Sequence, residues 1–262
     1  MPDIVVHNAM GEKVLQGLDA EIASVIDHDL FKVSVMGPDP YIYYRFFAPP
    51  FRRGINRRSS AMHRTRTQEF LTELVKMSRT DEVFSYAAGF LCHYSLDSTV
   101  HPFVNTMAGH RHDMHMAIER RLDNEELQRQ GKQRKDIMKL FTQDPDLTAA
   151  QTALRTVYGW DDSCFAAGYR HMKLYHWLAK DQHGLLAAVL SHIPGGLSAV
   201  PFDTKRADHI DLSPFAALEK EAVEMGVRLV TAAYRFREGE IGEDELRAAI
   251  GNRNYAGGEA RE

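Results

Sequence analysis

The feature that most constrains the fold is a long helical pattern, from Thr80 to about Phe103, that carries three potential metal ligands. Thr80 is followed by two acids, which predicts a helix start, because a hydroxyl caps the first turn and negative charge suits the positive end of the helix dipole. The turns before His93 are apolar nearly all round, which predicts a buried helix. His93, Asp97 and His101 follow at four-residue spacing, so their side chains rise along one narrow stripe.

A carboxylate between two imidazoles on a buried helix needs a partner. An isolated buried carboxylate is very costly, so Asp97 must be hydrogen-bonded, paired or bound to metal. Two imidazoles and a carboxylate are good ligands for zinc or a similar ion. The alternative is a metal-free arrangement in which Asp97 accepts hydrogen bonds from two core histidines, and the stripe by itself favours metal.

The rest of the chain shows helical rather than strand periodicity, and no repeat, low-complexity tract or linker divides it. An irregular stretch begins at Gly37-Pro38-Asp39-Pro40 and extends to about residue 60. We therefore predict an all-α fold, a single multi-helix bundle over residues 1–250, followed by a flexible, polar C-terminal tail over residues 251–262. Further helices are expected at residues 8–27, from about 67 onward, and at 111–128, 133–142, 147–158, 165–190 and 213–237.

Composition excludes several classes of protein. The 262 residues are 44% hydrophobic and 26% charged, as in an ordinary globular protein, and the net charge of −4 argues against a wholesale nucleic-acid binder. The longest aliphatic run, residues 185–190, is far shorter than the roughly 20 residues of a membrane span. No secretory signal is visible, and the two cysteines, Cys92 and Cys164, allow at most one disulfide. These features predict a cytoplasmic protein without a transmembrane segment.

The next predicted helix adds two potential ligands. His115 and Glu119 stand one helical turn apart, which alone is more typical of a solvated pair on a helix surface. The pair gains weight because it follows the first stripe so closely. His110 and His112 compete for the same role, but they lie at the helix start, where an exposed position is expected.

Three more candidates come from the N-terminal part of the chain. His7 precedes the first predicted helix, Asp39 lies in the Gly-Pro-Asp-Pro turn, and His63 follows Met62. Taken alone, each is more typical of a structural role: a helix-start residue, a turn former and a surface imidazole. Together with the helical ligands they supply enough groups for more than one ion. Multi-metal sites can activate water and neutralise charge on a phosphoryl group.

Residues 41–68 carry seven arginines and no acid, with aromatic residues interleaved at the start. Arginine recognises phosphate bidentately, and aromatic faces hold a quaternary ammonium group or a base. Because the segment lies between two candidate ligands, we predict that Arg45, Arg53 and Tyr44 bind substrate. The alternative is a solvated loop whose aromatic side chains pack on the core.

Five pieces of this sequence together resemble the zinc-dependent phospholipase C family, in particular its bacterial branch without a signal peptide. They fall in the family's order over roughly the first half of the chain, and the stretch from His93 to Pro102 is the most specific. The pieces are Met1-Pro2 to His7-x-x-x-Gly11, Gly37-Pro38-Asp39-Pro40, Met62-His63, Gly89-Phe90-Leu91-Cys92-His93-Tyr94-x-Leu96-Asp97-Ser98-x-x-His101-Pro102, and His115-x-x-x-Glu119-x-x-x-Asp123.

The resemblance implies an all-α bundle of the phospholipase C and P1 nuclease type, with two or three zinc ions in a cleft. It implies that Asp97 bridges two ions and that Asp39 orients or deprotonates the attacking water, as the matching turn aspartate does in the family. In the secreted members the mature N-terminal residue also binds the third ion, and here that residue is Met1 or Pro2. The implied ligand sets are Asp39, His63, His93 and Asp97 for one zinc, His101, His115 and Glu119 for a second, and His7 with Asp97 for a third.

The sequence therefore predicts a zinc-dependent phosphodiesterase resembling phospholipase C. Its substrate is expected to be a phosphodiester such as a phospholipid head group, reached through peripheral contact with a membrane. Two alternatives stay open: a nuclease or nucleotidase of the S1/P1 type on the same metal scaffold, and a metal-binding protein without catalytic activity. If Asp39 is not the base, Asp123 is the next carboxylate to consider.

Overall fold

The computed structural model describes residues 4–48, 54–109, 111–141, 146–160, 163–178 and 204–261. Across these ranges the chain forms helices and no β-strand, apart from two isolated bridges near the C-terminus, so the all-α prediction is confirmed. The elements are α1 (Ile4–Gly17), α2 (Ala20–Ser24), α3 (His28–Ser34), α4 (Pro40–Tyr43), η2 (Gly54–Asn56), α5 (Arg57–Met62), α6 (Thr67–Lys76), α7 (Asp81–Ala108), α8 (His112–Arg129), η3 (Arg134–Leu140), α9 (Thr148–Tyr158), α10 (Ser163–Leu178), η4 (Lys205–Ala207), α12 (Phe215–Arg237) and α13 (Glu243–Ile250).

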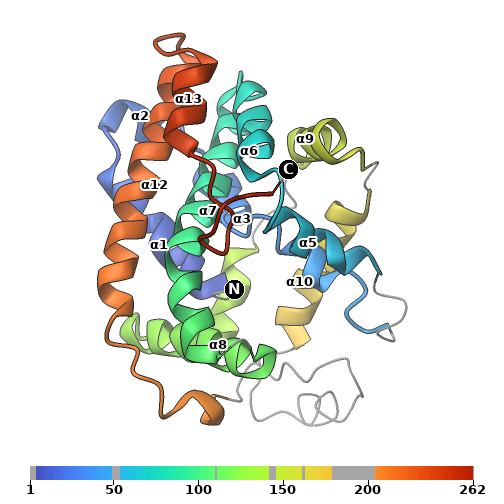
Figure 1. The fold of residues 1–262 in the computed structure, drawn as a ribbon, viewed down its shortest axis with the longest axis vertical. Helices are drawn as coiled ribbons and strands as arrows, with labels where there is room; N and C mark the ends of the chain where they lie inside the picture. The colour runs from blue at the N-terminus through green and yellow to red at the C-terminus, as the bar shows by residue number, and fades with distance from the viewer. Residues whose placement is uncertain are drawn as a thin grey trace.

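The long helix α7 is the centre of the bundle and packs against α12, α3, α1, α8 and α6 (Figure 1). Most of its length is buried, as its all-round apolar sequence predicts. Its start is also as predicted, because the Thr80 hydroxyl accepts a hydrogen bond from the amide of Val83 at 3.4 Å. The helix continues past the predicted end near Phe103 as far as Ala108, where Gly109 ends it in the left-handed conformation.

The predicted helix over residues 8–27 is wrong in its bounds, since the chain forms two helices there and the first begins earlier. Ile4, the first described residue, already lies in α1, and the carboxylate of Asp123 in α8 accepts hydrogen bonds from the amides of Val5 and Val6, at 3.4 and 3.0 Å. Asp123 is 117 residues away from Val6 in the chain, so the local sequence could not predict this contact. His7 lies within the first turns of α1 and not before the helix.

The turn before α4 brings a carboxylate against α7. The stretch predicted as irregular contains α4, η2 and the start of α5, and Asp39 is the residue immediately before α4. Gly37 turns the chain with a φ of +49°, and a Cβ there would lie 2.4 Å from the ring of His93. Glycine is therefore needed at this position both for the backbone conformation and for the close passage over the imidazole.

Residues 251–261 do not form the predicted frayed tail. In Figure 1 this segment, dark red, crosses α7 and continues toward α5. The ring of Tyr255 is buried, with 1% of its surface exposed, and its amide donates a hydrogen bond to the carbonyl of His63 at 3.1 Å. The burial of a large aromatic ring holds this polar segment on the bundle.

The remaining expectations are met in part. The predicted helix over 165–190 corresponds to α10 as far as Leu178, and the residues after it lie outside the described ranges. Cys92 is buried, Cys164 is half-buried, and neither forms a disulfide. Among the helices described here, none combines the length and the apolar character that a membrane crossing requires.

Candidate metal centre

The eight side chains predicted as ligands lie in one connected cluster inside the bundle. α7 contributes three of them and α8 two, and the others come from α1, the turn before α4 and the end of α5. Between neighbouring members, imidazole nitrogens and carboxylate oxygens lie 2.7 to 3.8 Å apart. The members are His7, Asp39, His63, His93, Asp97, His101, His115 and Glu119.

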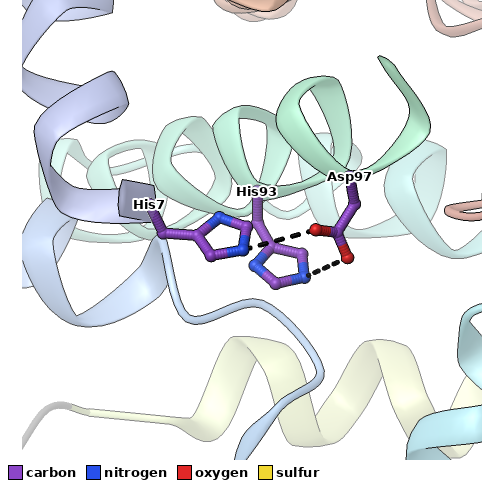
Figure 2. A group of neighbouring side chains, drawn as sticks. All are labelled: His7, His93 and Asp97. Atoms are coloured by element: carbon purple, nitrogen blue, oxygen red, sulfur yellow. Dashed lines mark ion pairs between the residues drawn. The ribbon is translucent and has the colours of Figure 1, made fainter. Parts of the chain in front are cut away.

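Asp97 lies at the centre of this cluster and is fully buried. Its Oδ1 is 3.3 Å from Nε2 of His7, whereas its Oδ2 is 3.2 Å from Nε2 of His93 (Figure 2). Nε2 of His63 lies 3.4 Å from the same Oδ2. The rings of His7 and His93 are stacked, with centroids 4.1 Å apart. The two carboxylate oxygens thus face different imidazoles, an arrangement that suits a carboxylate shared between two cations.

A second part of the cluster lies between α7 and α8. Nε2 of His115 is 2.7 Å from Oε1 of Glu119, and Nε2 of His101 is 3.4 Å from the same oxygen. Three sets of side chains each bring their ligand atoms within 4.8 Å of one another, close enough to hold one ion per set. The sets are His7, His93 and Asp97; Asp39, His63 and His93; and His101, His115 and Glu119.

Four of the five histidines turn Nδ1 toward an oxygen acceptor. Because a carbonyl oxygen can only accept, each such contact makes Nδ1 the protonated nitrogen of the neutral ring and leaves the lone pair of Nε2 facing the cluster. Metal-binding histidines are typically held in this way by their second nitrogen. The contacts are His63 to the carbonyl of Ser59 at 2.7 Å, His93 to that of Val35 at 2.9 Å, His101 to that of Tyr255 at 2.7 Å, and His115 to Oδ1 of Asn105 at 3.0 Å.

Many of the atoms that face one another in the cluster lack a hydrogen bond. These nitrogens and oxygens lie close together, but among the described residues none of them forms a hydrogen bond. A buried polar atom without a partner costs about 1–3 kcal/mol, so several in one place require an explanation. Cations bound in the separate sets would satisfy these atoms, and the imidazole and carboxylate donors fit zinc. The atoms are Nε2 of His7, His63, His93 and His101, Oδ1 of Asp39, and both oxygens of Asp97.

Protonation in the cluster also favours a cation. Burial is the main cause that lowers the pKa of His7 to about 4, that of His101 to about 3 and that of His115 to about 2. These rings are therefore neutral at pH 7, which is the form that binds metal. Burial alone would raise the pKa of Asp97, but the neighbouring imidazoles, His101 and His93 first, hold it well below its usual range.

Asp39 behaves differently from Asp97. Burial raises the pKa of Asp39 to about 6, although His93 and His63 act to lower it. Its Oδ1 lies 3.7 Å from Nε2 of His63 and 3.8 Å from Nε2 of His93. A carboxylate at the edge of the cluster whose pKa lies close to neutral pH can accept a proton during a reaction.

Two of the three predicted substrate-binding residues, Arg45 and Tyr44, lie beside α10. The amide of Arg45 donates to Nδ1 of His171 at 3.2 Å, and the ring of Tyr44 meets this imidazole edge-on. The guanidinium of Arg45 lies over the Tyr44 ring, 5.4 Å from its centroid. Arg53 lies outside the described residues. Tyr41, from the same aromatic run, is fully buried. At this position the aromatic side chain packs in the core, as the alternative interpretation expects.

Sequence reasoning missed three contributors to the site. Asn105, which faces His115, lies one turn after His101, and this four-residue spacing is a signal that could have identified it. Tyr255 and the capping role of Asp123 have no local signal, because both act across more than 100 residues. Of the two weaker ligand candidates, His112 is exposed at the start of α8, and His110 lies outside the described residues.

Comparison with known proteins adds one finding. The family model described as zinc-dependent phospholipase C matches residues 6–172, well over half of the chain. The matched range contains all eight members of the cluster and ends before η4, α12, α13 and the C-terminal segment. No curated protein and no solved structure matches.

Proposed function

Since the chain belongs to the zinc-dependent phospholipase C family, we propose that it hydrolyses a phosphodiester at a multinuclear zinc centre formed by the eight-residue cluster. The observation that carries this proposal is the convergence of buried imidazoles and carboxylates whose facing atoms have no hydrogen bonds. Zinc bound there would lower the pKa of water and neutralise charge on the phosphoryl group.

We assign the ligands as the three sets of neighbouring side chains suggest. His101, His115 and Glu119 would hold one ion, and Asp39, His63 and His93 another. His7 would hold a third together with Asp97, whose two oxygens face different imidazoles. The split orientation of Asp97 supports its role as the bridging ligand.

We assign to Asp39 the role of positioning and deprotonating the attacking water. Its position at the edge of the cluster, and a pKa raised by burial to about 6, support this role. Asp123, the other carboxylate considered as a base, is occupied by the amides at the start of α1. It is therefore the weaker candidate.

A phospholipid is the substrate class that we favour. Arg45 offers a guanidinium for phosphate, and two apolar residues within three positions of it in the chain are exposed: Phe47 is 58% and Ile42 41% exposed. Leu174 and Trp177 of α10, the helix that carries the neighbouring His171, are 40% and 49% exposed. A positive charge that can bind phosphate, together with exposed apolar side chains, suits a lipid better than a nucleotide.

The test combines metal analysis with a substrate panel. Purified protein should contain zinc and release phosphorylated head groups from phosphatidylcholine vesicles, and Asp39→Asn should lower turnover by about 10²- to 10⁴-fold while it keeps most of the zinc. Cleavage of single-stranded nucleic acid or 3′-nucleotides without lipid cleavage would instead select the nuclease function. Full zinc occupancy without activity on any phosphodiester would indicate a binding protein.

A further inference from the structure

We propose that residues 251–261, here called the C-terminal strap, are a positioning element that holds His101 and His63 in the orientation needed to bind metal. The inference rests on the metal centre proposed above. It extends that centre to a segment beyond residues 6–172, the range that the family model matches.

The backbone of a single strap residue contacts both histidines. The carbonyl of Tyr255 accepts a hydrogen bond from Nδ1 of His101 at 2.7 Å, and its amide donates to the carbonyl of His63 at 3.1 Å. The two histidines belong to different sets of candidate ligands. A shift of this one residue would therefore disturb two parts of the cluster at once.

The side chain of Tyr255 fills the space beside the imidazoles. Its ring centroid lies 5.0 Å from that of His63, 5.7 Å from that of His93 and 5.3 Å from that of Tyr94. Only 1% of the residue is exposed. Without this ring the neighbouring imidazoles would gain room to rotate, because interiors are otherwise close-packed.

Both ends of the strap are fastened to the bundle. At its start, the hydroxyl of Tyr94 in α7 donates to the carbonyls of Ile250 and Arg253, at 3.1 and 3.3 Å. At its end, the amide of Arg261 donates to the carbonyl of Arg64 at 3.0 Å, and the amide of Arg66 donates to the carbonyl of Arg261 at 2.9 Å. The strap thus spans from α7 to the chain that follows His63.

A tight turn seats the strap on α7 directly beside His101. The side chain of Asn254 closes this turn, since it accepts hydrogen bonds from two later amides and donates to the carbonyl of Glu259. Gly257 in the turn has a φ of +81°, and a Cβ there would lie 2.3 Å from the ring of Pro102. Only glycine permits this approach, so Gly257 sets the distance between the strap and α7.

The hydrogen bond from His101 to Tyr255 determines which nitrogen of the His101 ring is free to bind metal. While Tyr255 accepts from Nδ1 of His101, the neutral ring keeps Nε2 unprotonated toward Glu119. If the carbonyl moves away, the proton is free to reside on Nε2, the nitrogen needed as a ligand. Loss of such an orienting partner typically lowers metal affinity 10- to 100-fold. The effect should fall most strongly on the set formed with His115 and Glu119.

The test uses glycine substitutions in the full-length chain. Gly257→Ala should drive the strap away from Pro102 without altering any ligand. Gly239→Ala is the matched control, because Gly239 has a similar φ of +76° but no atom lies within 4 Å of the added Cβ. Zinc affinity and stoichiometry would be measured by titration at buffered free zinc, and circular dichroism would check that each variant folds. We expect Gly257→Ala to bind one class of zinc 10- to 100-fold more weakly, and Gly239→Ala to bind zinc as the unaltered chain does.

A second pair of variants separates positioning from general stability. Tyr255→Phe keeps the ring and the backbone contacts and should retain affinity, whereas Tyr255→Ala should lose it. Histidine NMR of the metal-free protein should show the His101 proton on Nδ1 in the unaltered chain and Tyr255→Phe, and a mixture in Gly257→Ala. Equal zinc binding by all variants, or equal loss in both glycine variants, would overturn the strap's role. An unaltered chain that binds no zinc would instead refute the proposed function.

Discussion

At the scale of the residue, the buried Asp97 carboxylate lies at the centre of the cluster that we propose binds metal. It is fully buried, and its two oxygens lie within 3.4 Å of three imidazoles. An ionised carboxylate is stable in such a position only where positive charge or donors surround it. Burial keeps the ring of His7 neutral, and a bound cation would supply the charge that this ring cannot.

Replacement of Asp97 should remove more than one metal ion. We expect Asp97→Asn to lose zinc from the sets that contain His7 and His63, and with it all measurable hydrolysis, because an amide bridges two cations poorly. Elemental analysis of the dialysed protein would check the zinc content. Asp113→Asn, which alters an exposed carboxylate at the start of α8, is the control and should keep all its zinc.

The metal-free protein should lose stability in mild acid. An unfolded histidine titrates near pH 6.5, whereas burial lowers the pKa of His7 to about 4 and that of His101 to about 3. Their contribution to stability is therefore complete above pH 6.5 and declines as the pH falls toward 4, where the unfolded chain binds more protons. Asp39 acts in the opposite direction, because its raised pKa of about 6 lets the folded chain take up a proton first.

Chelated protein would be unfolded thermally at pH 7.0, 5.5 and 4.5. We expect the midpoint to fall at each step, because the lowered pKa values of His7, His101 and His115 outnumber the raised pKa values of Asp39 and His93, which act in the opposite direction. Each unit of pKa difference corresponds to about 1.4 kcal/mol. A midpoint that stays constant over this range would show that the histidines are not buried as neutral rings.

At the scale of the element, the geometry of the centre depends on how helix ends are joined. α1 presents His7 because Asp123 of α8 caps its first turn, and the turn before α4 presents Asp39 because Gly37 passes over His93. The start of α1 is capped by a distant residue, whereas α4 begins at a local signal, since Pro40 occupies its first turn. The proposed ligands His7 and Asp39 therefore depend on the packing of α1 and of the turn before α4 against α7 and α8.

Loss of the α1 cap should loosen His7 without removing a proposed base. We expect Asp123→Ala to lower the free energy of unfolding by about 1–2 kcal/mol, the typical value of a helix cap. It should also weaken binding of the zinc ion that His7 holds, whereas Asp113→Ala should do neither. Urea unfolding of the metal-free proteins and zinc titration would measure the two effects. A collapse of turnover with unchanged zinc binding would instead make Asp123 the base.

At the scale of the whole molecule, the sequence predicts those features of the fold that depend on residues close together in the chain. The central helix, its Thr80 cap and the stripe of His93, Asp97 and His101 follow from local spacing, and the structure has them. The first turn of α1 and the burial of Tyr255 could not be predicted, since each depends on a partner more than 100 residues away. A segment that is polar along its length gives no sign that one aromatic residue anchors it.

If zinc occupies the proposed centre, its removal should weaken the entire bundle, because the proposed ligands join α1, α5, α7 and α8. A ligand at about 1,000 times its Kd adds about 4 kcal/mol to the stability of the folded state. In a chain of this size 1 kcal/mol shifts the Tm by about 2–4 °C, so chelation should lower the Tm by about 10 °C. Calorimetry with and without chelator would measure the change, and added zinc should restore the Tm. A Tm insensitive to both would contradict a metal centre at this position.

His101 and Tyr255 are 154 residues apart in the chain, so His101 is synthesised well before the residue that it contacts. A chain still emerging from the ribosome already contains every proposed ligand once His115 and Glu119 have been made. It does not yet contain the carbonyl that orients His101. The nascent chain thus contains all the proposed ligands long before Tyr255 has been added, and we expect the proposed centre to reach its final geometry only after that. We expect zinc uptake with full affinity to follow the synthesis of Tyr255, because the proposed centre lacks a contact to His101 before then.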